Sequence, residues 1–235
     1  MVLGSGNITR VGDRLIVIGT IHVDPGSAAV VRDTILDVRP EVVALEIDEA
    51  RLYALQNPRL SRVGKSPGVS FLAMVLLEKF AGQLTGSAPG TEMLVATESA
   101  RRVGARVELV DVPIHTTIAG LRNLPLRERV RLLIDSISSL VLLPLGRPDF
   151  AGLTEGIEEQ LLLFRGRYPG LSRLLLDLRE DYMANRIATI LNSTTGHVVA
   201  VVGFGHLAAL SRRLAGNANK PAFSTSFEWT ISPGN

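Results

Sequence analysis

The chain has 235 residues, of which 46% are hydrophobic and 20% are charged, and its formal net charge is +2. This composition indicates a globular domain with a sizeable core and excludes disorder over most of the chain. Because cysteine is absent, disulfides and thiolate metal sites are excluded, and any metal must be held by His and carboxylate side chains.

The first predicted elements form a β-α-β unit. Short apolar runs at Leu15–Ile18 and Glu41–Glu46 are typical of strands buried on both faces of a parallel sheet. Between them, apolar residues at helical spacing predict a helix that begins near Pro25 or Ser27 and ends at Pro40.

The next segments repeat this alternation. Helices are expected at 46–55 and, with apolar residues nearly all round, at Val69–Gln83. A further helix is expected to be capped by Thr91 and to end at Gly104. The run "RVELVD" at 106–111 then predicts a third buried strand.

Helical patterns without a convincing strand fill about 112–195. They predict helices at about 115–123, 126–142, 153–166 and 169–192. In the last of these, Leu174, Leu178 and Tyr182 are expected to face the core, with Arg179, Glu180 and Arg186 facing elsewhere.

A strand at "HVVAVV" (197–202), a helix at "LAALSRRLAG" (207–216) and a final strand at "AFSTSFEW" (222–229) complete the expected elements. The chain is therefore predicted to be a single α/β domain over 1–235. We expect a mostly parallel central sheet flanked by helices, with a large helical insertion at about 112–195.

The pattern Gly-x-x-His occurs twice at the end of a predicted strand, as "GTIH" at 19–22 and "GFGH" at 203–206. Ligands of open α/β sheets bind beyond the carboxyl ends of the strands. The residues that follow the four predicted strands are His22, Glu46, Asp111 and His206. We therefore expect these four side chains to share one site.

Two imidazoles and a carboxylate are common ligands of a divalent metal with open coordination positions. The second carboxylate could act as a general base or orient a ligand His. Metal-free acid–base chemistry is the alternative, and a single His after a strand is most often a cap. His115 follows Asp111 closely and could reach the site, although a role at a helix start is the simpler interpretation. His197 begins its strand and is expected to be structural.

The chain also resembles a known family. The matching stretches are "GTIHVDPGSAAVVRDTILDVRPEVVALEIDEARL", "GTEMLVATESARRVGARVELVD", "LREDYMANRI" and "VVAVVGFGHLAAL". They are similar to the TraB family, also called the pheromone shutdown or PrgY-like family. That family is related to the Tiki proteases and, more distantly, to the erythromycin esterase and ChaN-like proteins.

The resemblance implies an α/β core with helical decoration and a metal-dependent hydrolase site. It assigns His22, Glu46 and His206 to the metal, and it matches Glu92 and Arg179 to recurrent family motifs. The chain departs from the family pattern at Leu178 and Glu180, where relatives usually have Glu and Asp, and at Val112-Pro113, where they tend to have Arg-Asp.

We accordingly expect a metal-dependent hydrolase that acts as a peptidase on short peptides, with Mn, Co, Fe or Zn as the ion. Glu46, Asp111 and Arg179 are the expected catalytic residues, and Arg179, Glu92 and His115 are expected to bind substrate. The alternative is a non-catalytic protein that sequesters a peptide or another small ligand such as haem.

We expect no nucleic-acid partner, because the basic cluster "RNLPLRERVR" at 122–131 lacks interleaved aromatic residues. No apolar run reaches the roughly 18 residues of a membrane span, and the N-terminus lacks the order of a signal peptide. We therefore expect a cytoplasmic protein without an integral membrane segment. The apolar helices at Val69–Gln83 and 126–145 could form a homodimer interface.

Overall fold

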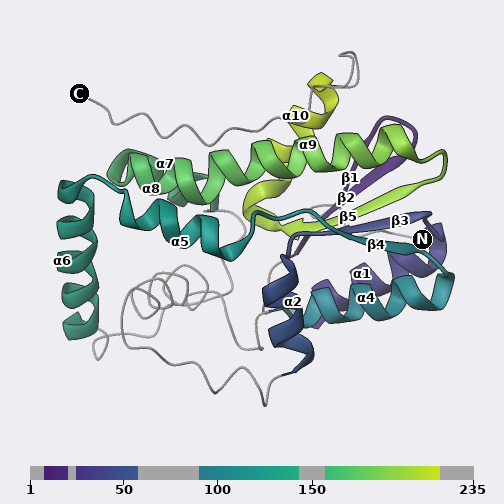
Figure 1. Ribbon diagram of the computed structural model, residues 1–235, viewed down its shortest axis with the longest axis horizontal. Helices are drawn as coiled ribbons and strands as arrows, with labels where there is room; N and C mark the ends of the chain where they lie inside the picture. The colour runs from purple at the N-terminus through teal and green to yellow at the C-terminus, as the bar shows by residue number, and fades with distance from the viewer. Residues whose placement is uncertain (1–7, 21–24, 58–89, 143–156, 218–235) are drawn as a thin grey trace.

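The computed structural model describes residues 8–20, 25–57, 90–142 and 157–217. Five strands form one sheet in the order β1-β2-β5-β3-β4, in which β1 is antiparallel to β2 and the other pairs are parallel (Figure 1). The strands are β1 (Ile8–Val11), β2 (Leu15–Thr20), β3 (Val42–Leu45), β4 (Arg106–Leu109) and β5 (Val198–Gly203). The predicted α/β fold with a mostly parallel sheet is confirmed.

The strand β5 lies between β2 and β3, although it is the last strand described along the chain. Thr20 at the end of β2 pairs with Gly203, and Leu45 at the end of β3 pairs with Val201. The carboxyl ends of three parallel strands therefore meet at one edge of the sheet. The strand β1 is absent from the sequence-based expectation, because it has only four residues and the central two are Thr and Arg, which gives little apolar signal.

Helices cover both faces of the sheet. On one face lie α1 (Pro25–Val38) and α4 (Thr91–Val103), and on the other lie α9 (Leu178–Ser193) and α10 (Phe204–Asn217) (Figure 1). In β5, Val199 and Val201 pack against the first pair of helices, whereas Val198, Ala200 and Val202 pack against the second pair. Alternate residues of a strand point to opposite faces, so the continuous apolar run reflects burial on both faces.

The helix α4 begins differently from the prediction. Its N-cap is Gly90, at φ +98°, whereas Thr91 is the first helical residue and is exposed. The prediction that Thr91 caps this helix is therefore wrong. Glycine adopts positive φ without steric cost, and a Cβ at this position would collide with Leu55 of α2 (Glu49–Gln56). The predicted stop at Gly104 is confirmed, since it is the C-cap at φ +73°.

The elements described between β4 and β5 are all helices. They are α5 (Ile114–Arg122), α6 (Leu126–Leu142), α7 (Ile157–Arg167), the short α8 (Pro169–Ser172), one π-helical segment η4 (Arg173–Asp177) and α9. None of the described helices is both long and apolar enough to cross a membrane. The helix expected at Val69–Gln83 and the strand expected at 222–229 lie outside the described residues.

The π-helical segment η4 changes which residues of α9 face the core. A π turn contains an additional residue, so it rotates the following helix relative to an uninterrupted α-helical pattern. Leu174 is buried as predicted, but Leu178 and Tyr182 are only half-buried. The side chains that α9 contributes to the core are those of Met183, Ala184, Ile187 and Ile190. Glu180 is 1% exposed, so the prediction that it faces away from the core is wrong.

Candidate functional site

Glu46 follows β3 at the carboxyl edge of the sheet. Its Oε2 accepts a hydrogen bond from the backbone N–H of Gly203 at 2.7 Å, and its Oε1 accepts one from Nη2 of Arg179 at 2.5 Å. The side chain is 7% exposed. Glu46 therefore joins the ends of β3 and β5 to the helix α9.

Asp111 follows β4 at the same edge, and its side chain is fully buried. Its carboxylate accepts hydrogen bonds from Nε and Nη2 of Arg179 at 2.9 and 2.7 Å, from the Val112 N–H at 2.7 Å, and from Nη2 of Arg51. Burial opposes ionisation of this carboxyl, but the charges and hydrogen bonds of Arg179 and Arg51 outweigh it and lower its pKa to about 2. Asp111 is therefore an anion at neutral pH.

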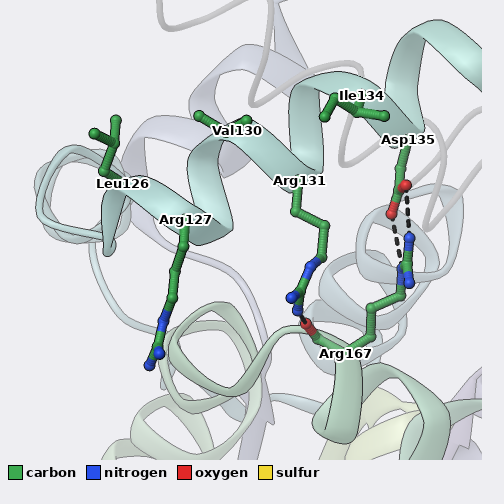
Figure 2. A pocket seen from close by; sticks show the side chains of 7 residues that line it. All are labelled: Leu126, Arg127, Val130, Arg131, Ile134, Asp135 and Arg167. Carbon is green, nitrogen blue, oxygen red and sulfur yellow. Dashed lines mark hydrogen bonds and ion pairs between the residues drawn. The ribbon is translucent and has the colours of Figure 1, made fainter.

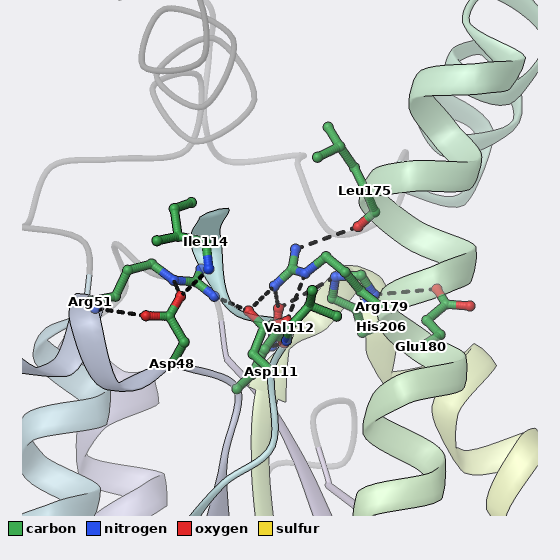
Figure 3. Close-up of polar contacts among 11 residues, drawn as sticks. Asp48, Arg51, Asp111, Val112, Ile114, Leu175, Arg179, Glu180 and His206 are labelled. Carbon is green, nitrogen blue, oxygen red and sulfur yellow. Dashed lines mark hydrogen bonds and ion pairs between the residues drawn. The ribbon is translucent and has the colours of Figure 1, made fainter. Parts of the chain in front are cut away.

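Arg179 lies in the first turn of α9 and donates hydrogen bonds to Glu46 and Asp111, and Figure 3 shows its guanidinium group beside Asp111. Its side chain is 18% exposed. Burial disfavours the guanidinium cation, but the two carboxylates more than compensate and raise the pKa of Arg179 above its ordinary value. The bidentate contact with Asp111 also fixes the plane of the guanidinium group.

Asp48 and Arg51 extend this network outwards. Asp48 is the N-cap of α2, where its Oδ1 accepts the Arg51 N–H at 2.9 Å, and its Oδ2 accepts hydrogen bonds from Nε of Arg51 at 2.7 Å and from the Ile114 N–H at 3.0 Å. Sequence reasoning missed Arg51. The available signal is that it stands three residues after an Asp at the start of a helix, where capping by the Asp brings the two side chains together.

His206 lies in the first turn of α10 and is 6% exposed. Its Nε2 is 3.4 Å from Oε1 of Glu46, and its Nδ1 is 3.3 Å from Oε1 of Glu180 on α9. Oε2 of Glu180 accepts a hydrogen bond from Nη1 of Arg213 at 2.6 Å, and Nε of Arg213 donates to Asp181 at 2.7 Å. Burial raises the pKa of Glu180, but its hydrogen bond to His206 and the charge of Arg213 lower it below its ordinary value.

The glycine of the first Gly-x-x-His motif has a steric role. A Cβ on Gly19 would lie 2.9 Å from Cδ2 of Leu207 and 3.3 Å from Cα of Phe204. Gly19 thus allows α10, which carries His206, to pack closely against β2. His22 lies outside the described residues, three positions beyond Gly19 along the chain. The expected proximity of His22 and His206 stays a prediction.

The other candidate residues lie at the starts of helices or beside a strand. Glu92 is buried in the first turn of α4, on the opposite face of the sheet from α9. His115 is exposed in the first turn of α5, beside Ile114. His197 is exposed immediately before β5, and its carbonyl oxygen accepts the Glu41 N–H at 2.8 Å. The substrate-binding roles of Glu92 and His115 stay predictions.

The donor atoms can be compared with the requirements of a divalent ion. Within the described part of the chain, no group of three His, Asp or Glu side chains is arranged to hold a metal. Asp111 fits less well than Glu46, because both of its oxygens accept hydrogen bonds from arginine, whereas Oε2 of Glu46 accepts one from a backbone N–H. His206 and Glu46 do fit, because they bring one imidazole nitrogen and one carboxylate oxygen within 3.4 Å of each other. A third ligand would have to come from outside these residues, and His22 follows the neighbouring strand.

A separate cavity lies along α6, at the end of the molecule that is distant from the sheet (Figures 1 and 2). It has a volume of about 630 Å³ and is lined by Leu126, Arg127, Val130, Arg131, Ile134, Asp135 and Arg167. Leu126 and Ile134 are 72% and 56% exposed. The homodimer interface expected on this helix stays a prediction.

Comparison with known proteins identifies a family that covers most of the chain. The model of the TraB/PrgY/gumN family matches residues 7–216. The chain belongs to the TraB/PrgY/gumN family. The match includes every element of the sheet and each of the residues in the network around Arg179 and His206.

Similar proteins occur in an archaeon and in mammals. The chain is 29% identical over 208 residues to an uncharacterized protein of Methanocaldococcus jannaschii, covering 84% of this chain and 52% of that protein. It is 27% and 26% identical to TraB domain-containing proteins of Bos taurus and Homo sapiens, covering 88% of this chain and 64% of each. The chain thus spans between half and two thirds of the length of these relatives.

Proposed function

We propose that this protein is a metal-dependent hydrolase for short peptides, with its reaction centre at the carboxyl edge of β3 and β5. The observation that carries the proposal is the position of His206. One ring nitrogen faces a buried carboxylate, Glu180, and the other faces Glu46. A carboxylate behind an imidazole is the usual arrangement around a metal-binding histidine.

In this proposal, His22, Glu46 and His206 hold a divalent ion such as Mn, Co, Fe or Zn. When bound, such an ion would polarise the carbonyl group of the substrate and make a water molecule easier to deprotonate. The charges around the site favour a cation. The side chains linked by contacts from Asp48 to Arg213 carry five carboxylates and three guanidinium groups, a formal charge of −2 with His206 neutral.

Arg179 binds substrate in this proposal. Its guanidinium group cannot lose its proton near neutral pH, so it serves as a fixed positive charge for a peptide carboxylate or for the oxyanion that forms during hydrolysis. Asp111 and Glu46 hold that group in place before any ligand arrives. The low pKa of Asp111 argues for this anchoring role, because a carboxylate with a pKa of about 2 is a weak base.

The first test is metal content. Purified protein is expected to retain about one divalent ion per chain, and both His22→Ala and His206→Ala are expected to lose it. His197→Ala is the matched control, because His197 is exposed before β5, away from the carboxyl edge of the strands, and this variant should retain the ion. Full occupancy in both His22→Ala and His206→Ala would contradict the proposed site.

The second test separates hydrolysis from binding. A library of short peptides is incubated with the protein and added Mn²⁺ or Co²⁺, and the products are identified by mass spectrometry. New termini that depend on His206 support a peptidase. Intact peptides retained in stoichiometric amount would instead support the non-catalytic alternative. One observation favours that alternative: both oxygens of Glu46 already accept hydrogen bonds, so the described network is satisfied without a reaction partner.

A further inference from the structure

The ring of His206 lies between two carboxylates, but its two nitrogens are not equivalent. Nδ1 faces Oε1 of Glu180 with hydrogen-bond geometry at 3.3 Å. Nε2 is 3.4 Å from Oε1 of Glu46, which already accepts a hydrogen bond from Arg179 at 2.5 Å. Which nitrogen carries the proton of the neutral ring decides which nitrogen offers a lone pair.

Glu180 can only accept a hydrogen bond from His206. It is 1% exposed, and its other oxygen accepts a hydrogen bond from Nη1 of Arg213 at 2.6 Å. An ionised carboxylate has no proton to donate, and a guanidinium group has no lone pair to offer. The hydrogen bond at Nδ1 must therefore be donated by the ring.

We propose that Glu180, held by Arg213, is the positioning residue that keeps the proton of His206 on Nδ1 and so presents the lone pair of Nε2 to Glu46. The use of that lone pair to bind a metal rests on the proposed function. The location of the proton does not, because it follows from the hydrogen-bond geometry between Nδ1 and Glu180.

The position of Arg213 is itself fixed. Its Nε donates to Oδ1 of Asp181 at 2.7 Å, so two neighbouring acids of α9 hold one arginine of α10. Arg213 lies seven residues after His206, two turns along the same face of α10. The relay from Arg213 through Glu180 to His206 therefore couples the two helices that cover one face of the sheet (Figure 3 shows Glu180 beside His206).

The experiment is nitrogen-15 NMR of the histidine side chains in metal-free protein. The chain has four histidines, and the spectrum of His206→Ala assigns the ring in question. In wild-type protein, the neutral His206 ring is expected to carry its proton on Nδ1. A neutral ring with the proton on Nε2 would overturn the proposal, and this measurement needs no Glu180 variant.

The variant E180Q is expected to reverse the tautomer. Glutamine has one carbonyl oxygen, which must face the donor Nη1 of Arg213, so its NH₂ group faces Nδ1 of His206. Nδ1 then accepts, and the proton moves to Nε2. In E180Q/R213M the glutamine oxygen no longer has to face Arg213. The amide can then turn its oxygen towards His206, and the ring proton should return to Nδ1. R213M alone is the control and should keep the wild-type tautomer, because its Glu180 remains a carboxylate.

An unchanged Nδ1 proton in folded E180Q would overturn the role of Glu180, and a proton that stays on Nε2 in E180Q/R213M would overturn the role of Arg213. Titration with Co²⁺ alone, followed by calorimetry, gives a second readout. E180Q should bind Co²⁺ about 10–100-fold more weakly than wild type, as is typical when the partner of a metal-binding His is altered.

The outcomes separate the two proposals. If wild-type protein binds no Co²⁺, the proposed metal site fails, and the tautomer alone decides whether Glu180 positions the ring. If wild type and E180Q bind Co²⁺ equally well, the metal site stands and the positioning role of Glu180 is overturned.

Discussion

Replacing Asp111 with Asn is the most direct perturbation of the network, because it removes one buried charge and keeps the shape of the side chain. In wild-type protein this carboxylate is surrounded by Arg179, Arg51 and the Val112 N–H. The neutral amide leaves two guanidinium groups with one carboxylate fewer. The asparagine also has an NH₂ group in place of one carboxylate oxygen, so the N–H groups that this oxygen accepted lose their acceptor.

The magnitude follows from the lowered pKa of Asp111. A pKa of about 2 instead of the ordinary 3.8 stabilises the folded state by about 2 kcal/mol at pH 7. Loss of one partner from a buried ion pair costs about 3–5 kcal/mol in other proteins. We therefore expect Asp111→Asn to reduce the free energy of unfolding by about 2–4 kcal/mol at neutral pH.

The same reasoning determines the pH dependence. Because the pKa of Asp111 is lower in the folded than in the unfolded chain, its contribution is complete above its ordinary value of 3.8 and is lost as the pH falls through about 2. The linkage relation leaves about 1 kcal/mol of this contribution at pH 3. The difference between wild type and Asp111→Asn should therefore narrow as the solution is acidified from pH 5 to pH 3.

Urea unfolding followed by circular dichroism at pH 7, 5, 4 and 3, in the presence of a chelator, measures this difference. With a urea dependence of about 2 kcal/mol per molar, the midpoint at pH 7 should fall by about 1–2 M. Asp135→Asn is the matched control. Its partners include Arg167 and the hydroxyl of Tyr168. The side chains of Asp135 and Arg167 are 31% and 56% exposed, and the cost should be under about 1 kcal/mol. A difference for Asp111→Asn that stays constant between pH 7 and pH 3 would refute the reasoning.

Two further substitutions test the packing around the site. Gly19→Ala places a Cβ 3.3 Å from Cα of Phe204 and should lower the free energy of unfolding, measured with urea, by about 1–3 kcal/mol. A Cβ at Gly166 would meet no atom within 4 Å, so Gly166→Ala should be neutral or stabilising by up to about 1 kcal/mol. Equal effects of the two substitutions would contradict the close approach of α10 to β2. Glu128→Ala removes the acceptor of the Gly170 and Leu171 N–H groups, both at 3.0 Å. It should lower the free energy of unfolding by about 1–2 kcal/mol by the same measurement. A loss below about 0.5 kcal/mol would show that Glu128 does not cap α8.

The strands of the parallel sheet could be predicted because their signal is local. Four apolar runs end at a polar residue or at glycine, and that pattern requires no knowledge of distant contacts. The same logic brought Glu46, Asp111 and His206 to one edge, since parallel strands that share a sheet also share their carboxyl end. In the structure, Arg179 joins Glu46 to Asp111, and Glu46 lies 3.4 Å from His206. The candidacy of Arg179 came from family resemblance and not from its spacing.

Glu180 shows where sequence reasoning failed. Its inward orientation depends on the π-helical segment at Arg173–Asp177, and an uninterrupted helical pattern that places Leu174, Leu178 and Tyr182 inside necessarily places Glu180 outside. Nothing in the run of leucines at 174–176 indicates a π turn, because each of them fits either phase. Arg213 was missed for a related reason: a charged residue near the end of a helix usually lies in solvent, and only the buried Glu180 explains its position.

The contacts divide the four carboxylates nearest Arg179 and His206 into two groups. Asp48 and Asp111 have their oxygens turned towards arginines and backbone N–H groups, which suits them to hold Arg51 and Arg179. Glu46 and Glu180 each place an oxygen within 3.4 Å of His206, one on either side of its ring.

Only Glu46 belongs to both groups, because its Oε1 is also 2.5 Å from Arg179. A change at Asp111 should therefore reach His206 through Arg179 and Glu46, whereas a change at Glu180 reaches it directly. If metal binding depends on the His206 ring, Asp111→Asn should weaken Co²⁺ binding less than E180Q does. If Asp111→Asn weakened Co²⁺ binding more than E180Q, the affinity for the ion would depend more on the orientation of Glu46 than on that of His206.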